Sequence, residues 1–325
     1  MRAIRVHQFG DPSVLTVDEV PTPEPGAGQV QVRVHAAGVN PVDTYIRSGR
    51  YGVLPTLPYI PGSDGAGTIS ALGPGATRWK VGDRVFFHGT ALGRPYGAYA
   101  EFTVNDEDKL YPLPANVGFA EGAALGVPYA TAYRALFHRA HAKAGEIVLV
   151  HGASGGVGIA ALQLARWKGL RVIGTAGSAP GLDLVRANGA HFAISHKEAL
   201  YLDQIKAAAD QGRGPDVILE MLANVNLDQD LDIIASYGRI VVIGNRGRIE
   251  IDPRKIMTRD AVVTGLTLWN ASQEDLATIY RDLVTGLESG VLVPVIGQEW
   301  PFAEAARAHD AVMTQGAYGK IVLLP

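Results

Sequence analysis

The sequence predicts an α/β protein in which a doubly wound parallel sheet is combined with an irregular β domain. Three observations support this fold class. The chain has 325 residues, of which 47% are hydrophobic, so it is longer than a single core usually requires. Residues 1–122 are rich in Gly and Pro and contain short alternating stretches. From about Pro128 onward, aliphatic runs alternate with amphipathic ones.

The β domain is predicted from stretches in which strand-forming residues alternate with polar ones. The two clearest are "QVQVRVHAAGV" at 29–39 and "GDRVFFHG" at 82–89. Short strands separated by Gly and Pro are typical of an irregular β domain. We place this domain at residues 1–122.

The parallel sheet is predicted from five aliphatic runs, "IVLVHG", "LRVIGTAG", "HFAISH", "DVILEML" and "GRIVVIG". Helical patterns separate them: "GVGIAALQLARWKG", "GLDLVRANGA", "EALYLDQIKAAADQ" and "LDQDLDIIAS". Continuous aliphatic strands divided by helices imply a parallel sheet that is covered on both faces. A sixth strand is expected in "AVVTGLTLW" at 261–269, and the domain is placed at residues 123–270.

The remaining residues, 271–325, form a tail with mixed patterns. We expect a helix at "QEDLATIYRDLVTGLESG", a strand near "PVIGQEW", a helix at "FAEAARAHDAVMTQG" and a last strand at "GKIVLLP". Because the parallel sheet is already complete without these elements, the tail is predicted to rejoin the first domain.

Composition excludes several classes of protein. The chain has 29 basic and 32 acidic residues and a formal net charge of −3, which offers no electrostatic reason to bind nucleic acid or an anionic membrane. It has no cysteine, so disulfides and thiolate-ligated metals are excluded. The start "MRAIRVHQFG" lacks the apolar core of a signal peptide, and no apolar run approaches the ~20 residues of a membrane span. A cytoplasmic location is expected.

The stretch "VHGASGGVG" at 150–158 joins the first aliphatic strand to the helix that follows it. In the G-x-G-x-x-G fingerprint, the first glycine makes the turn, the second lets the backbone approach pyrophosphate, and the third lets helix and strand pack closely. Here the register is Ala153, Gly155 and Gly158, so Gly152 is expected to make the turn. The turn and the helix N-terminus predict a dinucleotide site, although a tightly packed turn without a ligand remains the alternative.

The end of the second aliphatic strand bears on the choice of dinucleotide. NAD sites usually place Asp or Glu there to bind the ribose, whereas this strand ends in "GTAGS" and the first acidic residue is Asp183. Small residues leave room for a 2'-phosphate, so NADP(H) is the predicted cofactor. The cation that would bind the phosphate is expected to be Arg171, Lys197 or Arg246.

Several motifs in both domains resemble those of the zeta-crystallin type of quinone oxidoreductase, in the medium-chain dehydrogenase/reductase superfamily. They are "VHGASGGVG", "GTAG", "EMLANVNL", "GRIVVIGNRG", "GVNPVDTYIRSG" and "PYIPGSDGAG". The resemblance runs from "RAIRVHQFG" to "GKIVLLP" and implies a GroES-like first domain, a Rossmann second domain and a cofactor cleft at their junction. It also implies NADPH-dependent reduction of quinones, or of activated carbon–carbon double bonds in related members.

The resemblance also predicts that the protein works without zinc. Zinc-dependent relatives carry a cysteine where this chain has Asn40, and a His-Glu pair where it has Ser63 and Asp64. Among the nine histidines, only His138 and His141 have a spacing that suggests ligands on one helical face, and no third ligand lies nearby in sequence. Without a Lewis acid, alcohol dehydrogenation is not expected, whereas quinones and enones need less activation.

Cofactor-binding residues follow from the resemblance position by position. Tyr45 would reach the nicotinamide from the first domain, although a half-buried packing role is equally compatible with the sequence. For two other residues the alternative to cofactor binding is a capping role: Asn226 would cap a helix, and His196 would cap a strand. The residues expected to bind the cofactor are Tyr45, Ser154, Gly155, Gly156, Val157, Gly177, Ser178, His196, Asn226, Ile243, Gly244, Asn245, Arg246, Leu266, Thr267 and Leu268.

The catalytic residues are less constrained by the sequence. Tyr45, Asn40 and Asp43 are the candidates, the last two as polar contacts to substrate, and nothing in the sequence assigns a proton donor, so water would serve. The leading function is reduction of quinones by NADPH, with reduction of enones, alkenals or enoyl thioesters as the alternative. RNA binding or a structural, crystallin-like role is the alternative of another class.

Assembly is predicted from the sixth strand, 261–269. An aliphatic, nearly chargeless strand at the edge of a sheet is a liability if it stays unpaired. Pairing with the same strand of a second subunit would bury Val262, Val263 and Leu266. Dimers are common and tetramers are known in the superfamily, so a homodimer or a homotetramer is expected.

Overall fold

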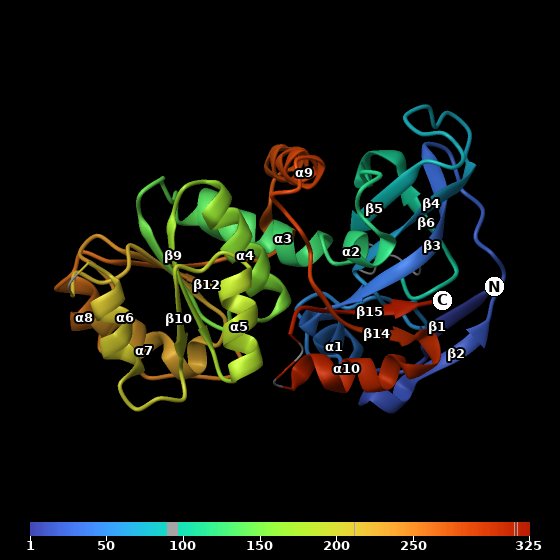
Figure 1. Ribbon diagram of the computed structural model, residues 1–325. Coiled ribbons are helices and arrows are strands. Elements are labelled where there is room, and N and C mark those ends of the chain that lie inside the picture. The colour runs from blue at the N-terminus through green and yellow to red at the C-terminus, as the bar shows by residue number, and fades with distance from the viewer. Residues whose placement is uncertain (90–96, 211, 315, 317) are drawn as a thin grey trace. The chain divides into compact units, whose positions relative to one another are not determined.

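The computed structural model describes residues 1–89, 97–210, 212–314, 316 and 318–325. The chain divides into two compact units (Figure 1). Unit 1 comprises Met1–Val127 and Val284–Pro325, and unit 2 comprises Pro128–Leu283. In the described part of the chain, no helix is long and apolar enough to cross a membrane.

The boundaries of the units differ from those placed at 122/123 and 270/271 on the sequence. The second boundary falls inside helix α9, Gln273–Glu288, rather than before it. The beginning of α9 belongs to unit 2 because the Tyr133 hydroxyl donates to Asp282 Oδ2 at 2.7 Å and Lys168 Nζ lies 3.3 Å from the same atom. The end of α9 belongs to unit 1, where Asn116 Nδ2 donates to the Leu287 carbonyl at 3.0 Å.

Unit 1 is built on a seven-stranded sheet in the order β14-β15-β3-β4-β5-β7, with β6 also paired to β3. A separate antiparallel pair, β1 and β2, completes its strands. The alternation in β3 follows from its sequence, since Val30, Val32 and Val34 are buried on one face. The strands are β1 (Arg2–Val6), β2 (Leu15–Glu19), β3 (Gln29–Val39), β4 (Asp64–Leu72), β5 (Arg84–His88), β6 (Phe102–Asp106), β7 (Leu110–Pro112), β14 (Ile296–Pro301) and β15 (Lys320–Leu324).

The tail rejoins the N-terminal part of the chain, as the sequence predicted. Strand β15 pairs antiparallel with β3, with Ile321 opposite Val39, and β14 pairs parallel with β15. Figure 1 shows these red strands beside the blue strands of unit 1. The helices of unit 1 are α1 (Pro41–Arg47), α2 (Phe119–Ala123) and α10 (Ala305–Met313), with short 3-10 turns η1 (Pro12–Val14), η2 (Glu107–Lys109) and η5 (Phe302–Glu304).

Unit 2 contains a six-stranded sheet in which every neighbouring pair is parallel. The order β10-β9-β8-β11-β12-β13 becomes 3-2-1-4-5-6 when the strands are numbered along the chain, which is the Rossmann order. The predicted fold class is therefore confirmed. The strands are β8 (Ile147–Val150), β9 (Arg171–Ala176), β10 (Phe192–Ser195), β11 (Val217–Glu220), β12 (Arg239–Val242) and β13 (Val262–Gly265).

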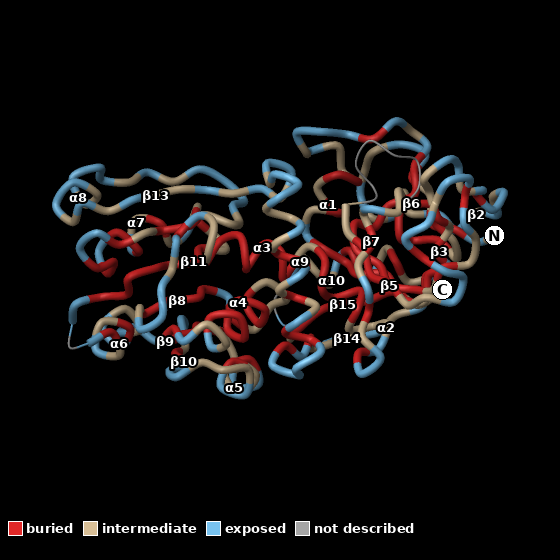
Figure 2. Tube along the Cα trace, turned by 90° about the horizontal axis from the view of Figure 1, so that it is seen from above, coloured by how far each residue is buried: buried red, intermediate tan, exposed pale blue. Residues whose placement is uncertain are grey.

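Helices link the strands of unit 2, as the alternating pattern requires. Burial follows the strand order, because β8 and β11 at the centre are buried while the edge strand β13 is partly exposed (Figure 2). The helical elements are α3 (Gly126–Tyr133), the π-helix η3 (Arg134–Arg139), α4 (Gly156–Trp167), α5 (Ala179–Ala187), α6 (Tyr201–Ala208), α7 (Ala223–Ile233), α8 (Pro253–Met257) and the 3-10 turn η4 (Leu268–Asn270).

Candidate functional site

The turn between β8 and α4 is shaped by three glycines with different tasks. Gly152 has φ of +57°, so it makes the sharp turn that the sequence assigned to it. A Cβ on Gly158 would lie 2.6 Å from both Ala153 Cα and the Gly152 carbonyl oxygen, so this glycine is required for close packing of helix on strand. A Cβ on Gly155 would lie 3.5 Å from its nearest neighbour, which leaves open space beside the turn.

This turn has the geometry of an anion site. Helix α4 has 12 residues, and its first turn presents backbone N–H groups and the positive end of the helix dipole. Ser154, Gly155, Gly156 and Val157 all lie at this point, after the carboxyl end of a central strand. In an open parallel sheet, the carboxyl ends of the strands are where ligands bind.

The carboxyl end of β9 carries no acidic side chain. A Cβ on Gly177 would lie 2.7 Å from His196 Nε2 and 3.2 Å from Lys197 Cε, so a histidine and a lysine flank this position. Ser178 is the N-cap of α5 and accepts from the Gly181 amide at 3.2 Å. Burial is the main reason why the pKa of His196 is lowered, with His151 and Lys197 contributing.

The structure distinguishes two of the three side chains proposed to bind the 2'-phosphate, Lys197 and Arg171. Lys197 lies beside Gly177, at the carboxyl end of β9. Arg171 is the first residue of β9, at the opposite end of the strand, and its guanidinium pairs with Asp210. The expectation for Arg171 is therefore wrong, because a strand of six residues keeps its two ends well apart.

The strand ends of β11 and β12 bring together the next group of predicted residues. A Cβ on Gly244 would lie 2.2 Å from the Met221 carbonyl oxygen, so only glycine fits there. Ile243 precedes it, Asn245 Nδ2 donates to the Gly247 carbonyl at 2.7 Å, and the Arg246 amide donates to Asn224 Oδ1 at 2.8 Å. These contacts order the segment that follows β12.

Asn226 is not a helix cap. Helix α7 begins at Ala223 with Leu222 as its N-cap, so Asn226 lies inside the first turns of the helix. Its side-chain amide donates to Glu220 Oε1 at 3.1 Å. The capping alternative was wrong because the helix starts earlier than the "LDQDLDIIAS" pattern indicated.

The segment after β13 is held by a buried arginine. Arg134 donates to the Thr267 carbonyl at 2.9 Å and to the Asn270 carbonyl at 3.0 Å. Leu266, Thr267 and Leu268 are therefore fixed by their backbone, which suits the backbone contacts expected of them.

A cluster of three buried ionisable side chains lies below this edge of the sheet and was missed on the sequence. His151 directly follows β8, Glu220 ends β11, and Asp230 lies on α7. His151 Nε2 is 2.8 Å from Asp230 Oδ1 and 3.6 Å from Glu220 Oε2. The only signal in the sequence was an acid at the end of an otherwise aliphatic strand. We call these three residues the acid–histidine cluster.

A second polar cluster lies in unit 1. Lys320 Nζ donates to Asn40 Oδ1 and lies 3.2 Å from Asp64 Oδ2, while Asn40 Nδ2 donates to Asp64 Oδ2 at 2.9 Å. Asp43 accepts from the Ser63 hydroxyl at 2.6 Å and from the backbone N–H of Asn40 at 2.8 Å. All five side chains are buried. The structure thus brings Asn40 and Asp43 together and gives each of them partners within unit 1.

Burial controls the ionisation of this second cluster. It raises the pKa of Asp43 to about 6, against the effect of the Ser63 hydrogen bond. It also raises the pKa of Asp64 and lowers that of Lys320. Burial therefore disfavours the charged form of all three groups, and their hydrogen bonds within the cluster oppose this effect.

The other sequence candidates lie elsewhere. Tyr45 is half-buried on α1 of unit 1, so its packing alternative stays open. His138 lies in the π-helix η3, 3.2 Å from Asp275, whereas His141 lies beyond the end of that helix with φ of +50°. These two histidines do not share a helical face, because the helix ends at Arg139.

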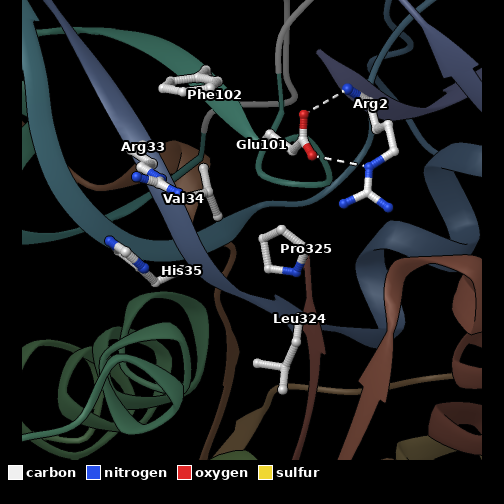
Figure 3. A pocket seen from close by; sticks show the side chains of 8 residues that line it. All are labelled: Arg2, Arg33, Val34, His35, Glu101, Phe102, Leu324 and Pro325. Carbon is white, nitrogen blue, oxygen red and sulfur yellow. Dashed lines mark hydrogen bonds and ion pairs between the residues drawn. The ribbon is translucent and has the colours of Figure 1, made fainter.

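A hollow of about 440 Å³ on unit 1 lies apart from the predicted site residues. The Arg2–Glu101 ion pair, at 2.9 Å, forms one wall (Figure 3). None of its lining residues belongs to the two polar clusters or to the glycine turn. They are Arg2, Arg33, Val34, His35, Glu101, Phe102, Leu324 and Pro325.

Comparison with known proteins assigns the chain to a family. Residues 26–115 match the alcohol dehydrogenase GroES-like domain, and residues 156–285 match the model described as zinc-binding dehydrogenase. The quinone oxidoreductase of Rattus norvegicus is 51% identical over 100% of this chain and 98% of its own length. The chain belongs to the quinone oxidoreductase family. The family lies within the medium-chain dehydrogenase/reductase superfamily, which confirms the resemblance seen in the sequence.

Solved structures of related proteins support the same assignment. The quinone oxidoreductase of Escherichia coli, complexed with NADPH, is 31% identical with a TM-score of 0.87, and the match covers 100% of both chains. An NAD-dependent alcohol dehydrogenase is 30% identical with a TM-score of 0.93, and that match also covers 100% of both chains. Proteins of this fold therefore use either dinucleotide, so the fold alone does not distinguish the two coenzymes.

Proposed function

We propose that this protein is an NADPH-dependent quinone oxidoreductase. Its membership of the family, through relatives as similar as 51% over the whole chain, carries the proposal. The glycine turn of unit 2 supports it, because Gly152, Gly155 and Gly158 each have the conformation or surroundings that a dinucleotide turn requires.

The residues of unit 2 fit a dinucleotide. The start of α4 would bind the pyrophosphate through Ser154, Gly155, Gly156 and Val157, since the Gly155 position is open and the helix dipole favours an anion. The segments after β12 and β13 would bind the nicotinamide end through Ile243, Gly244, Asn245, Leu266, Thr267 and Leu268. When bound, NADPH supplies a hydride, and the protein supplies binding, orientation and exclusion of water.

We propose that NADPH is preferred over NADH. Lys197 and His196 flank Gly177, and no carboxylate stands at the end of β9 to repel a 2'-phosphate. Ser178 and Arg246 would complete the adenosine side. The proposal concerns this chain's own residues, since relatives of the same fold include an NAD-dependent enzyme.

We propose that turnover requires no zinc. The chain has no cysteine, and Asn40, Ser63 and Asp64 stand where zinc-dependent relatives have ligands. Lys320 donates to Asn40 and lies 3.2 Å from Asp64, so its amino group already occupies the centre of this cluster. A metal ion would have to displace this amino group from the same oxygen atoms.

The substrate side is proposed in outline. Quinones and enones accept a hydride into a conjugated system, so they need no Lewis acid, and water would supply the proton. Tyr45 is half-buried and is proposed as a contact to nicotinamide or substrate. Asn40 and Asp43 are buried with their polar atoms paired, which favours a role in positioning α1 and its Tyr45.

The test is an NADPH oxidation assay with a set of quinones and enones, repeated after exhaustive chelation. We expect quinone-dependent oxidation that chelation leaves unchanged. Loss of turnover on chelation, restored by zinc, would contradict zinc independence. Turnover confined to enones would favour the alternative activity.

We also propose a homodimer or a larger homo-oligomer. Strand β13 is the edge of the parallel sheet, and Val262 on it is 52% exposed. Backbone groups on such an edge are satisfied when the same strand of a second subunit pairs with it. The cytoplasmic location expected from the sequence stays a prediction.

A further inference from the structure

The acid–histidine cluster (His151, Glu220 and Asp230) is not used in the proposed reaction. The exposed fractions of the three side chains are 5%, 0% and 1%, respectively. His151 directly follows β8, Glu220 ends β11, and Asp230 lies on α7. Thr175 Oγ1 on β9 lies 3.4 Å from His151 Nδ1. The cluster therefore connects three neighbouring strands and one helix below the carboxyl edge of the sheet.

The hydrogen bonds of the cluster indicate how many protons it holds. Glu220 Oε1 accepts from the Leu222 amide and from Asn226, and Asp230 Oδ1 lies at hydrogen-bond distance from His151. Among the described residues, no N–H or O–H group of the protein reaches Glu220 Oε2 or Asp230 Oδ2. Buried carboxylate oxygens without a donor are strongly unfavourable.

A proton between the two carboxyl groups removes this problem. One oxygen of Glu220 and one of Asp230 lie within 4.8 Å of each other, so a neutral Glu220 would direct its proton toward Asp230. Asp230 then accepts from protonated His151 as well, and the three groups together carry no net charge. One proton on Glu220 and one more on the imidazole of His151, two beyond the fully deprotonated state, thus satisfy both the hydrogen bonding and the charge of these buried side chains.

The backbone of the same residues forms the proposed cofactor edge. The His151 amide donates to the Leu219 carbonyl at 3.1 Å, just before the turn at Gly152. The Glu220 carbonyl accepts from the amides of Ile243 at 2.8 Å and Gly244 at 3.2 Å. A change in the charge of the cluster acts directly on the two segments that would bind the dinucleotide.

We propose that the acid–histidine cluster is a positioning device for the coenzyme: it holds two protons when the edge is in its binding form, and loss of the proton between Glu220 and Asp230 at alkaline pH weakens coenzyme binding. The proposal rests on the proposed dinucleotide function. Deprotonation leaves two carboxylates and one imidazolium, so a net negative charge forms beneath an edge built for phosphates.

The ionisation of the surrounding groups agrees with this. Burial raises the pKa of Glu220 to about 7 against the opposing effect of the His151 charge, and the charge of Asp230 adds to the rise. Burial opposes protonation of His151, but Asp230 and Glu220 raise the pKa of His151 above its ordinary value.

Two further titratable groups face the cluster from α6 and from the end of β10. They are Tyr201, whose pKa is raised by burial and by the two acids, and His196, whose pKa is lowered by burial and by His151. The positive charge of Lys197, the residue after His196, also lowers the pKa of His196. Neither His196 nor Tyr201 gains a positive charge as the pH rises, so neither compensates for the lost proton.

The test is the Kd for NADPH between pH 6 and pH 9, in the wild type, Glu220→Gln and the control Glu250→Gln, which removes an exposed carboxylate of the same unit. The amide of Gln mimics the neutral acid. We expect affinity to fall at least about threefold across this range in the wild type and the control, and to stay nearly constant in Glu220→Gln. A pH-independent wild type, or a Glu220→Gln variant that follows the wild type, would overturn the proposal.

Two measurements keep the test decisive if Glu220→Gln does not fold. The imidazole signals of His151 in the unliganded wild type should show a pKa above the ordinary value of 6.5, and a ring that is neutral at pH 6.5 would contradict the two-proton state. Metal analysis should find no bound divalent ion, since a stoichiometric ion lost in Asp230→Asn would mean that a cation takes the place of the protons. If neither NADPH nor NADH binds at any pH, the proposed function fails, while the imidazole titration still reports on the cluster.

Discussion

Lys197 is the residue on which the proposed coenzyme preference depends most directly. Its Cε would lie 3.2 Å from a Cβ at Gly177, at the strand end where the 2'-phosphate is expected. We predict that Lys197→Ala weakens NADPH binding by about threefold to tenfold, or ~1 kcal/mol, and leaves NADH binding unchanged. Titration of both coenzymes by fluorescence checks this, and equal losses for the two would argue against a phosphate contact.

Gly177→Asp provides a complementary test of the coenzyme preference, and the structure shows that this test needs an additional control. A Cβ at this position would lie 2.7 Å from His196 Nε2, so any side chain here displaces the histidine. Gly177→Ala is therefore the necessary control, because it adds the same Cβ without a charge. The additional loss of NADPH affinity in Gly177→Asp, relative to Gly177→Ala, measures the repulsion alone.

His309 determines part of the response of unit 1 to acid. Its side chain is buried on α10, 3.1 Å from the Tyr99 hydroxyl, and burial lowers its pKa to about 3. When the pKa of a histidine is lower in the folded state than in the unfolded state, the folded protein becomes less stable as the pH falls below 6.5. Between pH 6.5 and the folded-state pKa of about 3, the unfolded chain takes up the proton and the folded chain does not. We predict that His309 alone lowers the free energy of unfolding by about 2 kcal/mol between pH 8 and pH 5.

The measurement is urea unfolding of the wild type and His309→Gln at both pH values. The variant should be less stable at pH 8 because it loses the contact to Tyr99, yet it should lose less stability on acidification. His88, whose pKa burial lowers to about 4, should preserve part of the acid response in the variant. An identical pH dependence in the two proteins would refute the assignment to His309.

The turn between β8 and α4 shows how two nearby glycines, Gly155 and Gly158, have different roles. We predict that Gly158→Ala destabilises the protein by about 1–3 kcal/mol, because its Cβ would press on the backbone of Ala153 and Gly152. Gly155→Ala should leave the melting temperature nearly unchanged, since its Cβ meets nothing closer than 3.5 Å, but should weaken NADPH binding by filling space at the pyrophosphate position.

Thermal unfolding and NADPH titration of the two variants give the comparison. Each variant is the control for the other, since both add one methyl group to the same turn. Undiminished coenzyme affinity in Gly155→Ala would mean that the open space beside the turn is not the pyrophosphate position.

Assembly is the property that belongs to the whole molecule. Val263 packs against the core of unit 2, so a charge introduced there would also damage the subunit. Val262 on the same edge strand is 52% exposed and separates the two effects. We predict that the wild type sediments as a dimer or larger, and that Val262→Asp dissociates it and weakens NADPH binding through the adjoining segment 266–268.

Sedimentation velocity at micromolar concentration, with circular dichroism to confirm folding, tests this prediction. A monomeric wild type would exclude the proposed interface. A dissociated, folded Val262→Asp variant with unchanged NADPH affinity would preserve the dimer but remove the coupling between assembly and coenzyme binding.

The sequence alone determined the fold class, the six parallel strands of unit 2 and the glycine turn, because these depend on local periodicity and on the backbone freedom of individual residues. Strand β3 has the predicted bounds, 29–39, and Gly152 makes the predicted turn. The family assignment also followed from contiguous motifs. Such features are determined by residues that are close in sequence, so they can be predicted without knowing the long-range contacts.

Only the tertiary structure decided the contents of the two buried clusters. Lys320 meets Asn40 and Asp64 across more than 250 positions, and His151 meets Asp230 across 79. The start of α7 and the end of unit 2 within α9 depend likewise on long-range partners such as Tyr133 and Asp282. The physical reason is that burial and pairing fix the charge of an ionisable group, and both depend on residues that folding alone brings together.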